Sequence, residues 1–295
     1  MSRSGHRPFS LGRIAAITAN TFTELTRLKA LHILLFFALL LIGNSIFMAQ
    51  LTFQEEFQVL KDIALGSMSI FTSLLAVVAT ARLIPQDLEA RTLSTILAKP
   101  VARVEYLLGK LAGVLLLLAL SVIIMSALFF IVLKVREQTV LGETMQQTQA
   151  ATPDQRAEAL SAVRAAAFNV NLLSGIGIMY VKACLLAALT LFVSTFATTT
   201  IFTTVSMVFV YFIGHLQSTA REYWLQANSA GWLTKIFLAL VALLFPDLQL
   251  FNLADDIVAG SAIPLALFLK TAALGFFYAG FYLLLAWTVF YRKEL

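Results

Sequence analysis

One lysine lies deep within an apolar stretch, where its side chain could bind a substrate. Lys182 stands in the sequence GIGIMYVKACLLAALT, near the middle of a segment long enough to cross a membrane. A charge at the centre of a bilayer costs at least about 2.5–3.5 kcal/mol and usually faces a cavity or a partner. No acid lies within the apolar segments to pair with it. Lys182 is therefore a candidate contact for an anionic or polar group of a substrate, with structural packing as the alternative.

A second candidate is the short segment from Pro85 to Tyr106, which is dense in charge and reads PQDLEARTLSTILAKPVARVEY. Its helical pattern is interrupted at Pro100, which fixes φ and lacks an N–H, so that a helix would end there at a set angle. Arg103 carries a planar fork of N–H donors that can bind a carboxylate through two parallel bonds. Charges of both signs suit a polar interface with a partner. A solvated connecting loop is the alternative.

The sequence offers little for metal binding, catalysis or nucleotide binding. The histidines His6, His32 and His215 are far apart and lack ligand spacing, so we expect no metal site. Gly109-Lys110 resembles the end of a phosphate-binding loop, but Val104 stands where that motif requires its first glycine. We therefore expect no enzyme activity and no cofactor bound by this chain.

The elements that must position these residues are membrane-spanning helices. The chain has 295 residues, of which 60% are hydrophobic and 13% charged, whereas soluble domains average about 45–50% and about 25%. The apolar excess forms long blocks, which excludes a disordered chain and an ordinary cytosolic enzyme, and the single cysteine, Cys184, excludes a disulfide scaffold. We predict an all-α polytopic membrane protein with one transmembrane domain over residues 1–295. A span needs about 20 mostly apolar residues, and the predicted spans are 30–50, 63–84, 107–133, 172–196, 200–217 and 271–291.

Three segments outside these spans have their own patterns. Residues 9–28 repeat apolar positions at a spacing of three to four, which predicts an amphipathic helix on the inner leaflet, either a simple anchor or also a docking site for a cytosolic partner. Residues 134–171 form an extracytoplasmic loop, helical after Pro153, that is either a small helical cap or a mobile spacer. Residues 232–264 begin with only 14 apolar residues, which predicts a re-entrant segment before the last span.

The distribution of basic residues predicts the orientation. If the N-terminus is cytoplasmic and six spans cross, 12 Lys and Arg lie on the inner side and 7 on the outer side. Cytoplasmic loops carry the excess of Lys and Arg, so we expect both termini in the cytoplasm. The net charge of +5 is thereby assigned to a membrane face, and we expect membrane lipid rather than nucleic acid as a partner.

The charged segment also resembles a known signature. From Glu89 to Lys110 the chain reads EARTLSTILAKPVARVEYLLGK. This is similar to the pattern of ABC-2-type permeases, in which an acid precedes Thr-Leu, then Leu-x-x-Pro-[Val/Ile]-x-Arg, then Leu-Gly-Lys at the start of the third span. The later PDLQLFNLAD, from Pro246 to Asp255, resembles the outer segment of a subgroup that includes the permeases of nitrous-oxide reductase maturation and of gliding motility.

The resemblance implies the permease subunit of an ATP-binding-cassette transporter in the bacterial inner membrane, with export as the expected direction. Two permease copies, or two related permeases, would pair with two separately encoded ATPase subunits that bind ATP and Mg²⁺. Residues 85–106 would be the cytoplasmic coupling helix that docks on the ATPase, and the 134–171 loop, which is long for the family, leaves room for an extracytoplasmic partner. The candidate docking residues carried over are Glu89, Arg91, Thr92, Lys99, Pro100 and Arg103.

Two other functions stay open at this point. A membrane-anchoring subunit of a larger complex would need no more than the predicted spans. A secondary transporter would need coupling-ion groups, typically carboxylates within the membrane or broken helices in paired positions, and the sequence patterns show neither. The substrate cannot be named, because apolar side chains that line a cavity carry no legible code.

Overall fold

A computed structural model describes residues 10–50, 56–89, 102–150, 152–169, 171–226, 245–253 and 263–292, together with residues 232, 236, 257 and 258, and gives only the backbone for 219–226. Within these ranges all regular structure is helical. Six helices are long and apolar enough to cross a membrane, so the chain is a multi-pass membrane protein and the predicted fold class is confirmed. These helices are α2 (Lys29–Gln50), α3 (Glu56–Ala81), α6 (Arg103–Gln147), α8 (Asn171–Phe196), α9 (Thr200–Gln226) and α12 (Leu265–Arg292).

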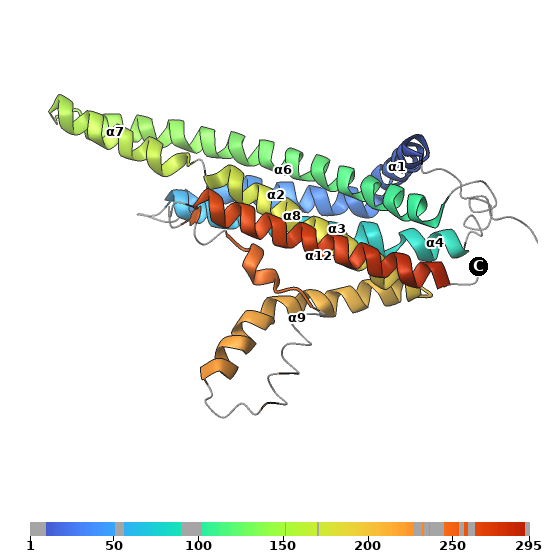
Figure 1. Cartoon of the computed structure of the whole chain (residues 1–295). Helices are drawn as coiled ribbons and strands as arrows, with labels where there is room; N and C mark the ends of the chain where they lie inside the picture. The colour runs from blue at the N-terminus through green and yellow to red at the C-terminus, as the bar shows by residue number, and fades with distance from the viewer. Residues whose placement is uncertain are drawn as a thin grey trace, which may run out of the picture.

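Helix α8 is the centre of the bundle. It contacts α12 most extensively and also packs on α3, α6 and α9, and Figure 1 shows it between these helices. Every residue from Val181 to Leu191 is buried. A helix that is apolar all round belongs in the interior of a protein or a membrane, which explains why α8 occupies this position. The more exposed α2, α9 and α12 instead present large apolar side chains outward, among them Phe36, Phe209 and Phe277.

One end of the bundle, called here the loop end, carries the two short helices α1 (Leu11–Thr26) and α4 (Leu83–Glu89). The end of α12 lies there too (Figure 1). The predicted helix within residues 9–28 is present, and it packs against the first turns of α6. The contact is close because α6 presents glycines: a Cβ at Gly113 would lie 2.7 Å from the Cβ of Thr21. The sequence places small residues where two helix backbones must approach.

The opposite end, the hairpin end, is extended by α6 and α7 (Pro153–Ala167). Helix α6 has 45 residues, hence a length of about 68 Å, whereas the hydrocarbon core of a bilayer is about 30 Å thick. Helix α7 returns along α6, and Figure 1 shows the pair projecting past the other helices. Thr152 caps α7 with Pro153 in its first turn, a favoured start for a helix. Of the two alternatives for residues 134–171, the structure therefore supports the helical one.

Helix α9 diverges from the bundle toward the hairpin end (Figure 1). A short 3₁₀ helix, η1 (Leu248–Phe251), packs against it and against α8. The contact uses Gly214 of α9, where a Cβ would lie 2.7 Å from Cγ of Leu248. Most of the predicted re-entrant segment, 232–264, lies outside the described residues, so its path stays a prediction.

Candidate functional site

The loop end holds a carboxylate that is wholly buried. Glu105, in the first turn of α6, is 0% exposed. Its Oε1 accepts a hydrogen bond from the backbone N–H of Ser10 at 2.8 Å, and its Oε2 accepts one from Ala102 at 3.1 Å. Nη1 of Arg13 lies 3.4 Å from Oε2. The carboxylate thus caps its own helix and fixes the beginning of α1 against α6.

Next to it, a lysine joins three helices. Nζ of Lys110 in α6 lies 2.8 Å from Oδ2 of Asp87 in α4 and 3.8 Å from Oε2 of Glu24 in α1. The hydroxyl of Tyr106 donates to the same Asp87 oxygen at 2.5 Å. Lys110 is 3% exposed, so its charge is balanced by carboxylates rather than by water. Together Arg13, Glu24, Asp87, Glu105, Tyr106 and Lys110 are called the loop-end cluster below.

Arg103 extends this arrangement to the last helix. Its Nη1 donates to the backbone carbonyls of Phe290 at 2.8 Å and Tyr291 at 2.7 Å, near the end of α12. The last carbonyls of a helix lack partners within the helix and carry partial negative charge, so an arginine there is favourable. The ring of Tyr106 also stacks on Phe290 at a centroid distance of 5.8 Å. The cluster is thereby connected to α12 as well as to α1 and α4.

The predicted docking residues fall into two groups. Glu89 is the exposed last residue of α4, and Arg103 lies just inside α6 with the internal contacts described above. The others, Arg91, Thr92, Lys99 and Pro100, lie outside the described residues. The two described positions frame the segment 90–101, so the loop-end cluster holds both ends of the predicted docking loop. The docking role of all six residues stays a prediction.

A polar recess of about 400 Å³ opens beside the cluster. It lies between the second half of α1 and the junction of α3 with α4, and its wall includes Asn20, Glu24, Arg27 and Arg82. Arg82 donates to the side-chain oxygen of Gln86 through Nε at 2.9 Å and Nη2 at 2.7 Å. Glu24, which also faces Lys110, connects the recess to the buried cluster.

The second candidate site surrounds Lys182 in the middle of the bundle. Lys182 is 2% exposed. Its Nζ donates to Oγ of Ser69 in α3 at 3.4 Å and lies 3.1 Å from Nε2 of His215 in α9. Nδ1 of His215 lies 3.0 Å from the carbonyl oxygen of Tyr211. Because only a protonated nitrogen can bond a carbonyl, Nδ1 carries the proton and Nε2 of a neutral ring accepts from Lys182. Lys182, Ser69, Tyr211 and His215 are called the Lys182 group below.

The described partners of this buried lysine are therefore neutral groups. Apart from Ser69 and His215, its described contact is the ring of Tyr211, whose centroid lies 5.5 Å from Nζ. In the described part of the chain no carboxylate lies within 4.0 Å of Nζ. Asp247, which caps η1, acts electrostatically on His215. Among the described residues, Lys182 thus lacks the direct counter-charge that Lys110 has.

An apolar cavity of about 180 Å³ adjoins this group, between α3 and α9. It is lined by Ser73, Val77, Val208 and Tyr211, among others. Ser73 lies one turn along α3 from Ser69, and Tyr211 lies one turn along α9 from His215. Residues four apart share a helix face, so the cavity and the Lys182 group occupy the same strip between the two helices.

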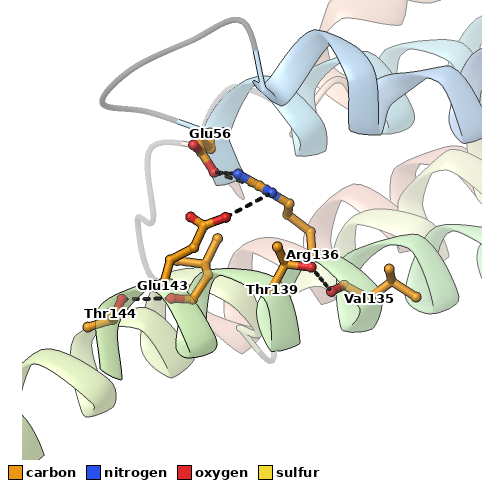
Figure 2. Close-up of polar contacts among 7 residues, drawn as sticks. Glu56, Val135, Arg136, Thr139, Glu143 and Thr144 are labelled. Atoms are coloured by element: carbon orange, nitrogen blue, oxygen red, sulfur yellow. Dashed lines mark hydrogen bonds and ion pairs between the residues drawn. The ribbon is translucent and has the colours of Figure 1, made fainter. Parts of the chain in front are cut away.

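Charges also gather at the base of the projecting hairpin. Figure 2 shows Arg136 of α6 pointing toward Glu56 at the start of α3, while Glu143 reaches the same guanidinium from further along α6. Nε of Arg136 donates to Glu56 at 3.0 Å. Close by, Nζ of Lys61 donates to the carbonyl oxygen of Ala166 at 2.6 Å. These contacts fix the hairpin to α3 and explain why α6 continues as a helix beyond the predicted span.

Lys182 was predicted from the sequence, but the residues that contact it were not. Asp87 and Glu105 were expected only as charges of the 85–106 loop, and Lys110 only as part of the sequence that opens the third span. One signal was present: Tyr211 and His215, like Ser69 and Ser73, are four residues apart on predicted helices. That spacing defines a face of each helix. It does not say which helices meet, so the site could not be assembled from it.

The chain was compared with known proteins. No family model matches it, and no curated protein is significantly similar to it. The function must therefore be argued from the residues and their geometry.

Proposed function

We propose that this chain is the permease subunit of an ATP-driven exporter, moving its substrate when a separate ATPase acts on the loop end. The proposal joins the resemblance of residues 89–110 to ABC-2-type permeases with one structural observation. Both ends of segment 90–101 are held by a buried cluster of charges that connects α1, α4 and α6 directly and α12 through Arg103.

The mechanical argument follows from how buried charges behave. Removing one partner of a buried ion pair is strongly unfavourable, so Asp87 and Lys110 move together. A force applied to segment 90–101 would act on Asp87 at one end and on Glu105 and Lys110 at the other. Rigid elements that share such contacts move as a body. The loop-end cluster would thus convert a local push on the loop into a joint tilt of several spans.

A separate ATPase supplies the difference in free energy between the two states, because a partner can shift an equilibrium only by its differential binding to them. The proposed assembly contains two permease chains and two ATPase subunits, and the substrate path runs between the permeases. Under this proposal the loop end faces the cytoplasm and the hairpin end faces outward.

Affinity purification of the full chain from its native membranes tests the proposal. We expect an ATPase subunit to copurify, and we expect the charge reversal Arg91→Glu combined with Lys99→Glu to lower its yield about tenfold or more, since interface charge pairs are typically worth over 1.4 kcal/mol. The matched control is Arg164→Glu on exposed α7, which should retain the ATPase. An intact transporter that works without any nucleotide-hydrolysing partner would contradict the proposal.

One observation favours a second candidate, an ion-coupled secondary transporter. Lys182 and His215 lie 3.1 Å apart, Nζ to Nε2, inside the bundle, and titratable groups within a membrane often mark ion pathways. Transport by the purified chain in vesicles that carry an ion gradient, with no nucleotide present, would select this candidate. Transport that requires hydrolysis would select the exporter.

A further inference from the structure

The strip between α3 and α9 combines a cationic group with an apolar hollow. At one end Lys182 is almost wholly buried among neutral partners. One helical turn away begins the apolar cavity, lined on α3 by Ser73 and Val77. Ser69 and Val77 are eight residues apart, so the strip is at least about 12 Å long. One end of the strip is therefore cationic and the other apolar, and the distance between them is comparable to the length of a short alkyl chain.

Tyr211 connects the two parts. Its ring faces Nζ of Lys182 on one side, at 5.5 Å from the centroid, and the same residue lines the cavity. A lysine ammonium carries three N–H donors, and the described acceptors are two, Ser69 and His215. One donor is therefore left for a further acceptor, and a buried cation is stabilised most by an acceptor that carries negative charge.

We propose that this strip binds an anionic amphiphile, with its acidic headgroup at Lys182 and its apolar body in the cavity between α3 and α9. The headgroup supplies the counter-charge that the described residues around Lys182 do not. The apolar body fits walls that are almost entirely hydrocarbon. That the amphiphile is a transported substrate rests on the proposed function; that it binds does not.

The chemistry shared by all such ligands is an acidic group on an apolar body, and two sources can provide it. One is an anionic phospholipid from the bilayer, and the other is a free single-chain amphiphile.

A binding experiment distinguishes the two sources. The full-length chain is placed in phosphatidylcholine nanodiscs, without ATPase or nucleotide. Dodecyl phosphate serves as the single-chain probe, phosphatidylglycerol as the bilayer probe, and dodecanol as the neutral probe. Binding is measured as Kd for the soluble probes and as bound lipid by native mass spectrometry.

We expect dodecyl phosphate or phosphatidylglycerol to bind at one site per chain, and whichever binds identifies the source. Lys182→Met should weaken that binding about tenfold or more, because it removes a hydrogen bond between charged groups. Lys182→Arg should restore most of it. The matched control, Lys270→Met, removes a lysine that is exposed at the start of α12 and should change Kd less than about twofold.

A second pair of variants tests the apolar end. Val208→Phe fills the cavity, whereas Val205→Phe makes the same change on an exposed face of α9 that does not line it. Only Val208→Phe should weaken both dodecyl phosphate and dodecanol. If the anionic probe that binds the wild type bound Lys182→Met equally well, or if neither anionic probe bound, the proposal would be overturned. No ATPase is present in this experiment, so a negative binding result would not contradict the proposed exporter function. Likewise, failure to copurify an ATPase would not contradict binding of the amphiphile.

Discussion

The two polar regions of this protein bury a lysine in opposite ways. In the loop-end cluster, Lys110 faces two carboxylates, and the contacts join α1, α4 and α6. In the Lys182 group, the lysine faces a hydroxyl, a neutral imidazole and an aromatic ring. Paired charges fix the helices that carry them, because separating the charges is costly. Among the described residues the Lys182 cation has no direct counter-charge, which leaves a place for an anionic ligand and so suits binding.

The same substitution at both lysines should have very different effects on stability. Lys110→Met leaves the buried Asp87 carboxylate without its cation, and we expect the free energy of unfolding to fall by about 3–5 kcal/mol. The measurement is unfolding of the solubilised protein by SDS titration. Adding Asp87→Asn should recover part of the loss, since the uncompensated charge is then removed. A loss no greater than that of Lys182→Met would contradict the contrast between the two sites.

A smaller effect is expected where α1 packs on α6 and brings Glu24 to Lys110. Gly113→Ala places a methyl group 2.7 Å from the Cβ of Thr21, so the helices must separate at a cost of about 1–3 kcal/mol. Gly142→Ala is the matched control, because a Cβ there has no atom within 4 Å. It should be neutral or stabilising by up to about 1 kcal/mol, as alanine favours a helix. Equal thermal stability of the two variants would show that the contact is looser than described.

The smallest change is expected at Lys182. Lys182→Met replaces a buried amine by an apolar side chain of similar length and leaves no carboxylate within 4.0 Å unpaired among the described residues. Such replacements are often neutral or stabilising, so we expect the free energy of unfolding to stay within about 1 kcal/mol of the wild type. The same SDS titration checks it. A large decrease in the free energy of unfolding would show that Lys182 has a structural role, as Lys110 does, and would contradict the contrast between the two regions.

The spans were predictable because hydrophobic length is a local property. The predicted starts and ends of five spans lie within nine residues of the helix ends, the largest difference being 217 against Gln226 in α9. The third span is the exception, since it was predicted to end at 133 and α6 continues to Gln147. Beyond the predicted span that helix is held by contacts with residues distant in sequence, such as Arg136 with Glu56. Hydropathy predicts only the apolar part of a helix, so it does not predict a continuation that is stabilised by polar contacts.

The candidate site was predictable only in part. Lys182 could be singled out because a charge in an apolar segment is conspicuous in the sequence itself. The clustering of Asp87, Glu105 and Lys110 could not be predicted in this way. Their spacing along the chain gives no sign that α1 packs against α6. The same holds for His215, which lies 33 residues from Lys182 in the sequence and 3.1 Å from it in space.

Length, hydropathy and charge are properties of the linear chain, so they were enough to predict six apolar helices, a charged loop and a lysine deep within one span. The pairing of the described charges could be seen only in the folded protein. That pairing depends on which helices touch, and helix contacts arise from packing between surfaces that are far apart in sequence.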